Sequence, residues 1–150
     1  MKQKNKTPEK AVEYFKNGYN CSQSVLLAMF EHWNSNNELV PKIATAFGGG
    51  IGRCGSLCGA LTGGVMALSA KYGTNEPLIE KRLRSYELAK QFYEQFELQN
   101  GSVFCRELIG YDLSKPEQAK KARESKTEEK CSGFIRKAVE ILLALTENAE

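Results

Sequence analysis

The segment from residue 47 to residue 64 reads FGGGIGRCGSLCGALTGG, and it holds eight of the chain's 13 glycines and two of its five cysteines, Cys54 and Cys58. Glycine lets the backbone adopt positive φ angles or approach another group closely, at an entropic cost when the chain becomes ordered. A chain that accepts this cost beside two thiols is shaping a specific local structure. The segment therefore predicts a thiol site.

Helical patterns surround this segment on both sides. Apolar residues recur at the i, i+3 and i+4 spacing of amphipathic helices, and no run of alternating residues predicts a strand. We expect one all-α domain over residues 1–150, a bundle of about six to eight helices without a sheet, with residues 1–6 as a disordered tail. The expected helices begin at Thr7 and end before Asn17, and then span 21–33 (capped by Asn20 or Ser22), 39–47, about 56–72, 77–98, 102–109 and about 131–145.

Composition and charge exclude several classes of partner. The net charge is +3, and Lys and Arg are interspersed with Asp and Glu, so neither nucleic acid nor lipid is an expected partner. The charged stretch 114–130 is expected to form a solvated helix face. No run of about 18 apolar residues is present, so no membrane span is expected. The polar N-terminus carries no secretory signal, which indicates the cytoplasm, where cysteines serve more often as metal ligands or redox groups than as disulfides.

Residues 50–55 match the dinucleotide-binding pattern G-x-G-x-x-G. That pattern binds a nucleotide only when a strand leads into the turn and an acidic residue ends a second strand about 20 positions later. Here the residues before the pattern are helical in character, and those after it form a helix and then a polar turn. No nucleotide cofactor is therefore expected.

Cys58 is the first candidate for a reactive thiol. If a helix begins near Ser56 or Leu57, Cys58 lies in its first turn, where unpaired N–H groups and the helix dipole lower a thiol pKa. Arg53 adds positive charge nearby. The alternative is that Cys58 is a small buried apolar residue, as most free cysteines are. A loop at residues 52–55 would also permit a reversible Cys54–Cys58 disulfide, which a continuous helix forbids.

A face of small residues follows Cys58. Gly59 and Gly63 are spaced i, i+4, and so are Ala60 and Gly64. Each glycine inside a helix costs roughly 1 kcal/mol relative to alanine. The pattern therefore indicates very close approach by another helix or by a bound group, with tight helix packing the simpler interpretation.

The cysteine motifs resemble those of one known family. Spacing alone fits no standard metal motif, because no C-x-x-C pair is present. The motifs GYNCSQSVL, AFGGGIG followed by CGALTGG, CRELIGYDLS and CSGFIRKAVEIL, however, resemble the C-GCAxxG-C-C family of redox-active proteins, in order and over about residues 14–145. One departure is Leu57, which stands where the family name has glycine.

The resemblance implies a small helical protein with a redox or metal site formed by four cysteines, namely Cys21, Cys58, Cys105 and Cys131, with Gly59 and Gly63 beside it. Cys54 lies outside this set and is a second candidate for thiol redox chemistry with Cys58. Four thiolates suit an iron–sulfur cluster, which would make the protein an electron carrier, or a structural zinc ion. A metal-free site would leave thiol–disulfide exchange, and a purely structural interaction module is the third alternative.

Other residues carry less information. His32 is the only histidine, so His-based triads and metalloprotease sites cannot be built. We expect it at the surface. Aromatic residues on the helix expected at 77–98 suit the core or a homodimer interface. The sequence does not identify the redox partner.

Overall fold

The computed structural model describes residues 5–149 of the chain. These residues form seven α-helices and two short 3-10 helices, in the order α1 (Thr7–Lys16), α2 (Cys21–His32), η1 (Lys42–Phe47), α3 (Gly59–Tyr72), η2 (Ile79–Lys81), α4 (Leu83–Asn100), α5 (Cys105–Ile109), α6 (Pro116–Arg123) and α7 (Thr127–Glu147). Within them there is no β-strand, only one isolated antiparallel bridge between Leu57 and Phe104. The all-α expectation is confirmed.

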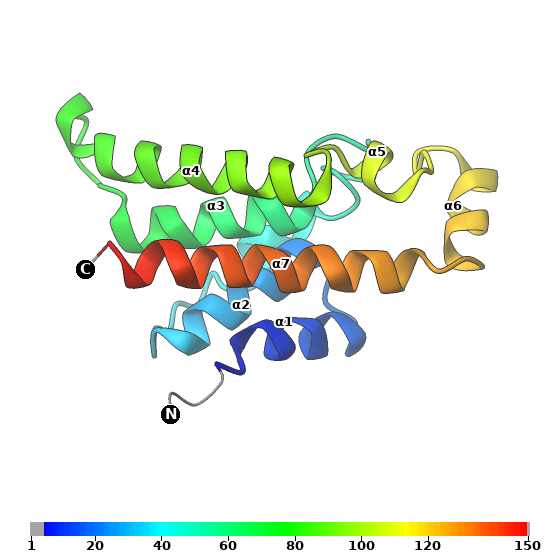
Figure 1. Cartoon of the computed structure of the whole chain (residues 1–150), viewed down its shortest axis with the longest axis horizontal. Coiled ribbons are helices and arrows are strands. Elements are labelled where there is room, and N and C mark those ends of the chain that lie inside the picture. Colours follow the sequence, from blue (N-terminus) through cyan, green and yellow to red (C-terminus); the bar gives the residue numbers. More distant parts are fainter. Residues whose placement is uncertain (1–4, 150) are drawn as a thin grey trace.

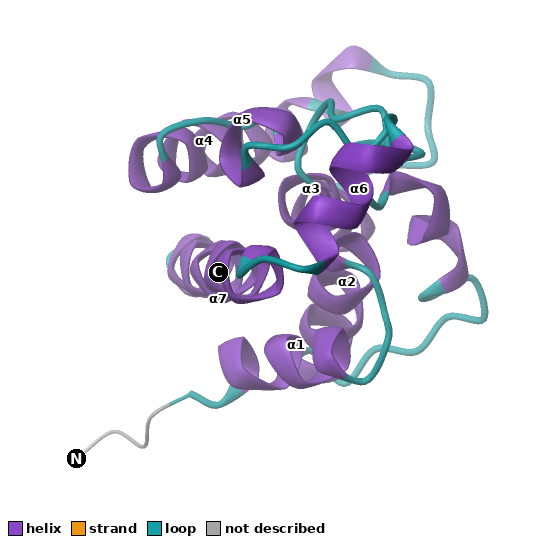
Figure 2. Ribbon diagram, turned by 90° about the vertical axis from the view of Figure 1, so that its right-hand side faces the viewer, coloured by secondary structure: helices purple, strands orange, loops and turns teal. Residues whose placement is uncertain are grey.

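The helix α3 lies at the centre of the packing. It contacts α2, α4 and α7, while α1 covers α2 and α7 from the other side. Figure 1 shows α3, α4 and α7 running side by side along the long axis, and the end view in Figure 2 shows α6 crossing one end of the bundle. The core is made of the apolar side chains that these helices share, chiefly Val25, Leu26, Met29, Leu61, Leu68, Phe92, Phe96, Ile135, Val139 and Leu142.

The small-residue face of α3 permits this packing. A Cβ atom added to Gly63 would meet the carbonyl oxygen of Ser22 on α2. An added Cβ at Gly59 would lie 2.8 Å from the Cys21 sulfur, and one at Gly64 would meet the ring of Phe92 on α4. The close approach expected from the glycine spacing is therefore present, and helices make it.

The N-terminus of α2 is fixed by a capping box. The Gln23 N–H donates to Asn20 Oδ1 at 2.9 Å, and the Asn20 N–H donates to Gln23 Oε1 at 3.1 Å. The cap is thus Asn20 and not Ser22, the other residue that the sequence offered. Such a cap contributes about 1 kcal/mol to a helix, and here it also fixes where Cys21 begins the helix.

Several predicted helix boundaries were wrong. The segment expected as a helix from Leu39 is a 3-10 helix that starts at Lys42, and the long helix α4 starts at Leu83 and not at Pro77. The last helix begins at Thr127, one turn before Cys131, and Glu128 and Glu129 favour a helix start there. The predicted start was late because this polar first turn carries no apolar periodicity.

The remaining boundaries differ less. The short helix α5 begins at Cys105, three residues after the expected start at Ser102. The N-cap of α1 is Lys6, and Thr7 is already helical. Of the expected disordered tail, residues 1–4 lie outside the described residues; Asn5 accepts a hydrogen bond from the Thr7 N–H at 2.9 Å.

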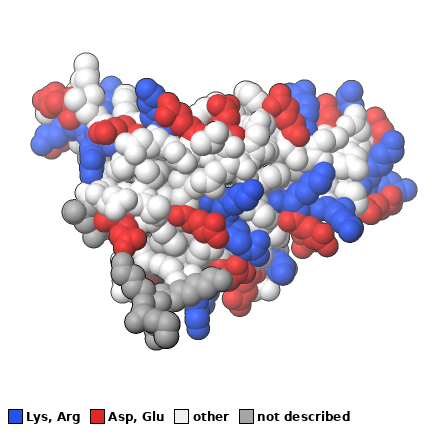
Figure 3. Space-filling model, in the orientation of Figure 1, with Lys and Arg blue, Asp and Glu red and all other residues white. Residues whose placement is uncertain are grey.

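The surface has no single-sign face in the view of Figure 3, where positive and negative side chains are interspersed. Among the described residues, no helix combines the length and the apolar character needed to cross a membrane.

We predict that Gly63→Ala destabilises the protein, although alanine favours a helix. The added Cβ would overlap the Ser22 carbonyl oxygen, and overpacking of this kind costs about 1–3 kcal/mol. Gly133 on α7 is the matched control, because nothing lies within 4 Å of a Cβ added there. Gly133→Ala should stabilise by roughly 0.5–1 kcal/mol. Urea unfolding of both variants checks this, and a neutral Gly63→Ala would contradict the close approach.

Candidate functional site

The glycine segment forms an ordered loop before α3. Its backbone has positive φ at Gly49, Gly50, Gly52 and Gly55, and also at Ile51 (68°) and Arg53 (66°). Positive φ in a β-branched residue such as Ile51 is rare and costs about 1–2 kcal/mol. Backbone hydrogen bonds within the loop offset this cost, among them Gly52 N–H to Ala46 at 2.8 Å and Ser56 N–H to Gly50 at 2.9 Å.

This loop brings Cys58 and Cys105 together. The Cys58 N–H donates to the Val103 carbonyl at 2.8 Å, and the Cys105 N–H donates to the Ser56 carbonyl at 2.7 Å. Gly50 packs directly against these two hydrogen-bonded segments, since a Cβ atom added to Gly50 would lie 2.7 Å from the Cβ of Cys105. Two cysteines that are 47 positions apart in the sequence are thus held on adjoining backbone segments.

Cys21 joins them from α2. Its sulfur lies over Gly59, the residue that follows Cys58, at the position where a side chain on Gly59 would otherwise stand. Burial raises the pKa of the Cys21 thiol, and the backbone N–H groups of Gly49, Ser22, Gly59 and Cys21 itself oppose this rise. The α2–α3 contact therefore also fixes the Cys21 thiol beside the N-terminus of α3.

Cys131 completes the group from the first turns of α7. Burial raises its pKa to about 12, and negative charge on Cys21 and Cys105 adds to this rise, which places all three thiols within electrostatic reach of one another. Burial and the charge of Cys21 likewise raise the pKa of Cys105 to about 11. The four cysteines of the motifs thus lie in the region where α2, α3, α5 and α7 approach one another, with Cys131 linked to Cys21 and Cys105 through its charge interactions.

The prediction that Cys58 has a lowered pKa is wrong. Cys58 is the N-cap of α3, just before the helix, and its side chain is buried. Burial raises its pKa well above the usual range, and the charges of Cys21 and Cys105 add to the effect, although the N–H groups of Ala60 and Leu61 oppose it. Loss of solvation outweighs the helix N-terminus because the thiol is almost out of contact with water.

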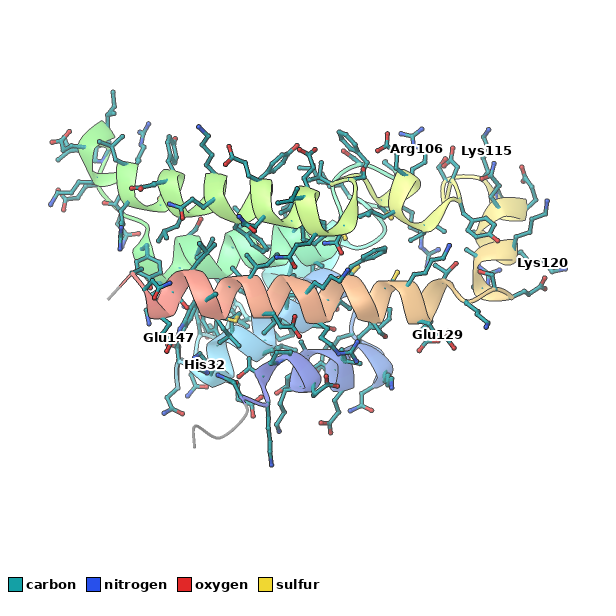
Figure 4. The ribbon with its side chains drawn as sticks, in the orientation of Figure 1. His32, Arg106, Lys115, Lys120, Glu129 and Glu147 are labelled. Atoms are coloured by element: carbon teal, nitrogen blue, oxygen red, sulfur yellow. The ribbon has the colours of Figure 1, made fainter. Side chains whose placement is uncertain are left out.

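Two other candidates lie apart from the four thiols. Cys54 is an exposed free thiol in the glycine loop. His32 is exposed, as expected, with its Nδ1 atom 3.4 Å from Thr7 Oγ1. Figure 4 shows His32 at one end of the molecule and Arg106, the neighbour of Cys105, toward the other end.

Some features of the site have no simple sequence signal. Ser22 is fully buried beside Cys21, and its Oγ atom has no hydrogen-bond partner in the described part of the chain. Gly50 and Gly55 shape the loop around Cys105 and Arg106. A serine after a cysteine is unremarkable in a sequence, and the glycines could be recognised only as requiring unusual backbone angles.

The donor set suits a thiolate-bound metal centre. Cysteine thiolates are soft metal ligands, and backbone N–H groups and the unpartnered buried Ser22 hydroxyl lie beside these thiols. Within residues 5–149, however, no three His, Cys, Asp or Glu side chains are grouped so that they could hold a metal ion. Metal binding would therefore require these thiol side chains to turn toward a common centre.

Comparisons with known proteins cover most of the chain. Residues 19–145 match the family described as "Putative redox-active protein (C_GCAxxG_C_C)". A protein of Archaeoglobus fulgidus named "Uncharacterized protein" is 30% identical over 154 aligned positions, which cover 96% of this chain and 95% of the relative. No solved structure matched the chain. The matched region includes Cys21, Cys58, Cys105 and Cys131.

The exposure of the thiols predicts their order of alkylation. In the reduced, metal-free native protein, iodoacetamide should modify exposed Cys54 at least about tenfold faster than buried Cys58, because the reactive species is an accessible thiolate. The rates at Cys105 and Cys131 should keep rising with pH toward their pKa values of about 11 and 12. Mass spectrometry of the peptides over time measures both. Faster modification of Cys58 than of Cys54 would contradict the burial described.

Proposed function

The chain belongs to the C_GCAxxG_C_C family, whose members are described as redox-active proteins, and on that premise we propose that its four convergent cysteines bind an iron–sulfur cluster and that the protein carries electrons. The proposal is supported by two observations: Cys58 and Cys105 lie on hydrogen-bonded backbone segments with the Cys21 sulfur over Gly59, and Cys131 lies within electrostatic reach of Cys21 and Cys105. Four cysteine thiolates are the usual ligand set of [2Fe–2S] and [4Fe–4S] clusters.

The contacts around the sulfurs support a charged centre at this place. Burial raises the pKa values of Cys58, Cys105 and Cys131, and repulsion between the ionised thiols adds to each rise. A metal centre supplies the missing positive charge and keeps such thiols deprotonated. Lys130 lowers the pKa of Cys131, but burial and the charges of Cys21 and Cys105 raise it by more.

The chain's own residues would tune such a centre. A bound cluster would supply reversible one-electron transfer. The N–H groups of Gly49 and Gly59 would donate to the Cys21 thiolate, and those of Ala60 and Leu61 to the Cys58 thiolate. Such hydrogen bonds to cluster sulfurs stabilise the more negative, reduced state. The buried Ser22 hydroxyl offers one more donor beside Cys21.

We expect the protein purified without oxygen to contain iron and acid-labile sulfide and to absorb in the visible region. Cys58→Ala should remove a ligand and lower the bound iron severalfold, and the same holds for Cys21, Cys105 and Cys131. Cys54→Ala is the matched control, since Cys54 is exposed in the neighbouring loop. It should retain the iron content and spectrum of the unmodified chain. Metal analysis together with circular dichroism separates loss of metal from loss of fold.

Three outcomes would contradict the proposal. Stoichiometric zinc in place of iron would make the site structural. A metal-free protein with a reversible disulfide between two of the five cysteines would make it a thiol–disulfide oxidoreductase. Independent alkylation of all four thiols, with neither metal nor disulfide, would leave no shared site.

A further inference from the structure

A cavity of about 510 Å³ lies beside the four-thiol site and contains the side chain of Cys131 in its wall. Three separate parts of the chain line it: the end of α1 with the following turn, the glycine loop, and the segment that runs from Leu113 through α6 to the start of α7. Its size falls within the range of sites that hold small organic ligands. The redox site proposed above uses Cys131 but leaves this cavity without a role.

The cavity combines an apolar wall with excess positive charge. Phe15, Leu113 and Ala122 supply apolar surface, and two arginines, Arg53 and Arg123, line the same space. No ion pair or side-chain hydrogen bond of either arginine is found among the described residues. The lining also includes one carboxylate, Glu128, whose charge reaches Cys131 and raises its pKa.

Arg53 is held at the cavity by an unusual backbone. It has a positive φ of 66°, and its N–H donates to the Gly48 carbonyl at 3.3 Å within the glycine loop. For a residue other than glycine this conformation is uncommon and is concentrated at functional sites. The loop that places Cys58 therefore also presents a cation to the cavity.

We propose that this cavity binds a small organic anion, with its carboxylate or similar group on Arg53 and Arg123 and its apolar body against Phe15 and Ala122, next to Cys131. Two guanidiniums against one carboxylate select an anion, and guanidiniums bind oxyanions through charge-assisted hydrogen bonds. The binding chemistry is independent of any metal; only the role of the cavity as the ligand site of the redox centre rests on the proposed function.

The test compares 2-naphthoate with its neutral counterpart 2-naphthamide, by calorimetry on the protein as purified. Naphthoate should bind at least about fivefold more tightly than the amide, and Arg53→Gln and Arg123→Gln should each weaken naphthoate binding roughly tenfold. Glu128→Gln should strengthen it, because a repelling charge is removed. Lys121→Gln is the control for net charge, since Lys121 is exposed on the same helix as Arg123 but outside the lining. It should leave the affinity unchanged.

The location is tested separately with methyl-labelled alanine. Naphthoate should shift the NMR signals of the Ala119 and Ala122 methyl groups, which line the cavity, and not that of Ala67, which is buried on α3, a helix that contributes no lining residue. The inference would be overturned if the acid and the amide bound equally well, or if Lys121→Gln weakened binding as much as the arginine variants. It would also be overturned if naphthoate shifted only methyl signals outside the cavity. Iron-free protein that still selects naphthoate would contradict the proposed function and leave this inference standing.

Discussion

The first turn of α2 lies directly on the backbone of α3 at Gly59 and Gly63, and the rest of the site depends on that contact. The missing side chains let the Ser22 carbonyl and the Cys21 sulfur occupy space that a Cβ would fill. The capping box of Asn20 and Gln23 fixes the start of α2 against this surface. Because Cys58 precedes Gly59, the same contact that packs the two helices also brings two thiols together.

The glycine loop extends this arrangement to the other two cysteines. Its hydrogen bonds to the Val103–Arg106 segment hold Cys105 beside Cys58, and α7 brings Cys131 from the far end of the chain. The outcome is an electrostatically linked group of thiols, in which Cys58 is buried and the other three residues are partly buried. Burial of this kind makes each thiol a poor nucleophile by itself, whereas a shared positive centre would favour the ionised form of all four.

The sequence was most informative where the chemistry is local. Apolar spacing predicted the helices around residues 21–32 and 83–98, Asn20 was one of two candidate caps, and the Gly59/Gly63 spacing predicted a close approach. The motifs around the four cysteines were sufficient for the family. The polar first turn of α7 was missed, because residues 127–130 face solvent and leave no apolar pattern.

The raised pKa of Cys58 could not be predicted from the residues next to it in the sequence. A position at the start of a helix predicts a low pKa. The partners that bury this thiol and raise its pKa, Cys21 and Cys105, lie 37 and 47 positions away. The cavity beside Cys131 is equally non-local, since Arg53 and Arg123 meet there only after the glycine loop and α6 have packed. Both features depend on tertiary packing, which local patterns do not encode.

Anomalous X-ray diffraction at the iron edge, from crystals grown without oxygen, would locate the bound iron. We expect iron density enclosed by the sulfur atoms of Cys21, Cys58, Cys105 and Cys131, with Cys54 outside it. Iron bound elsewhere, or a metal-free site whose four sulfur atoms point away from one another, would contradict the proposed cluster site.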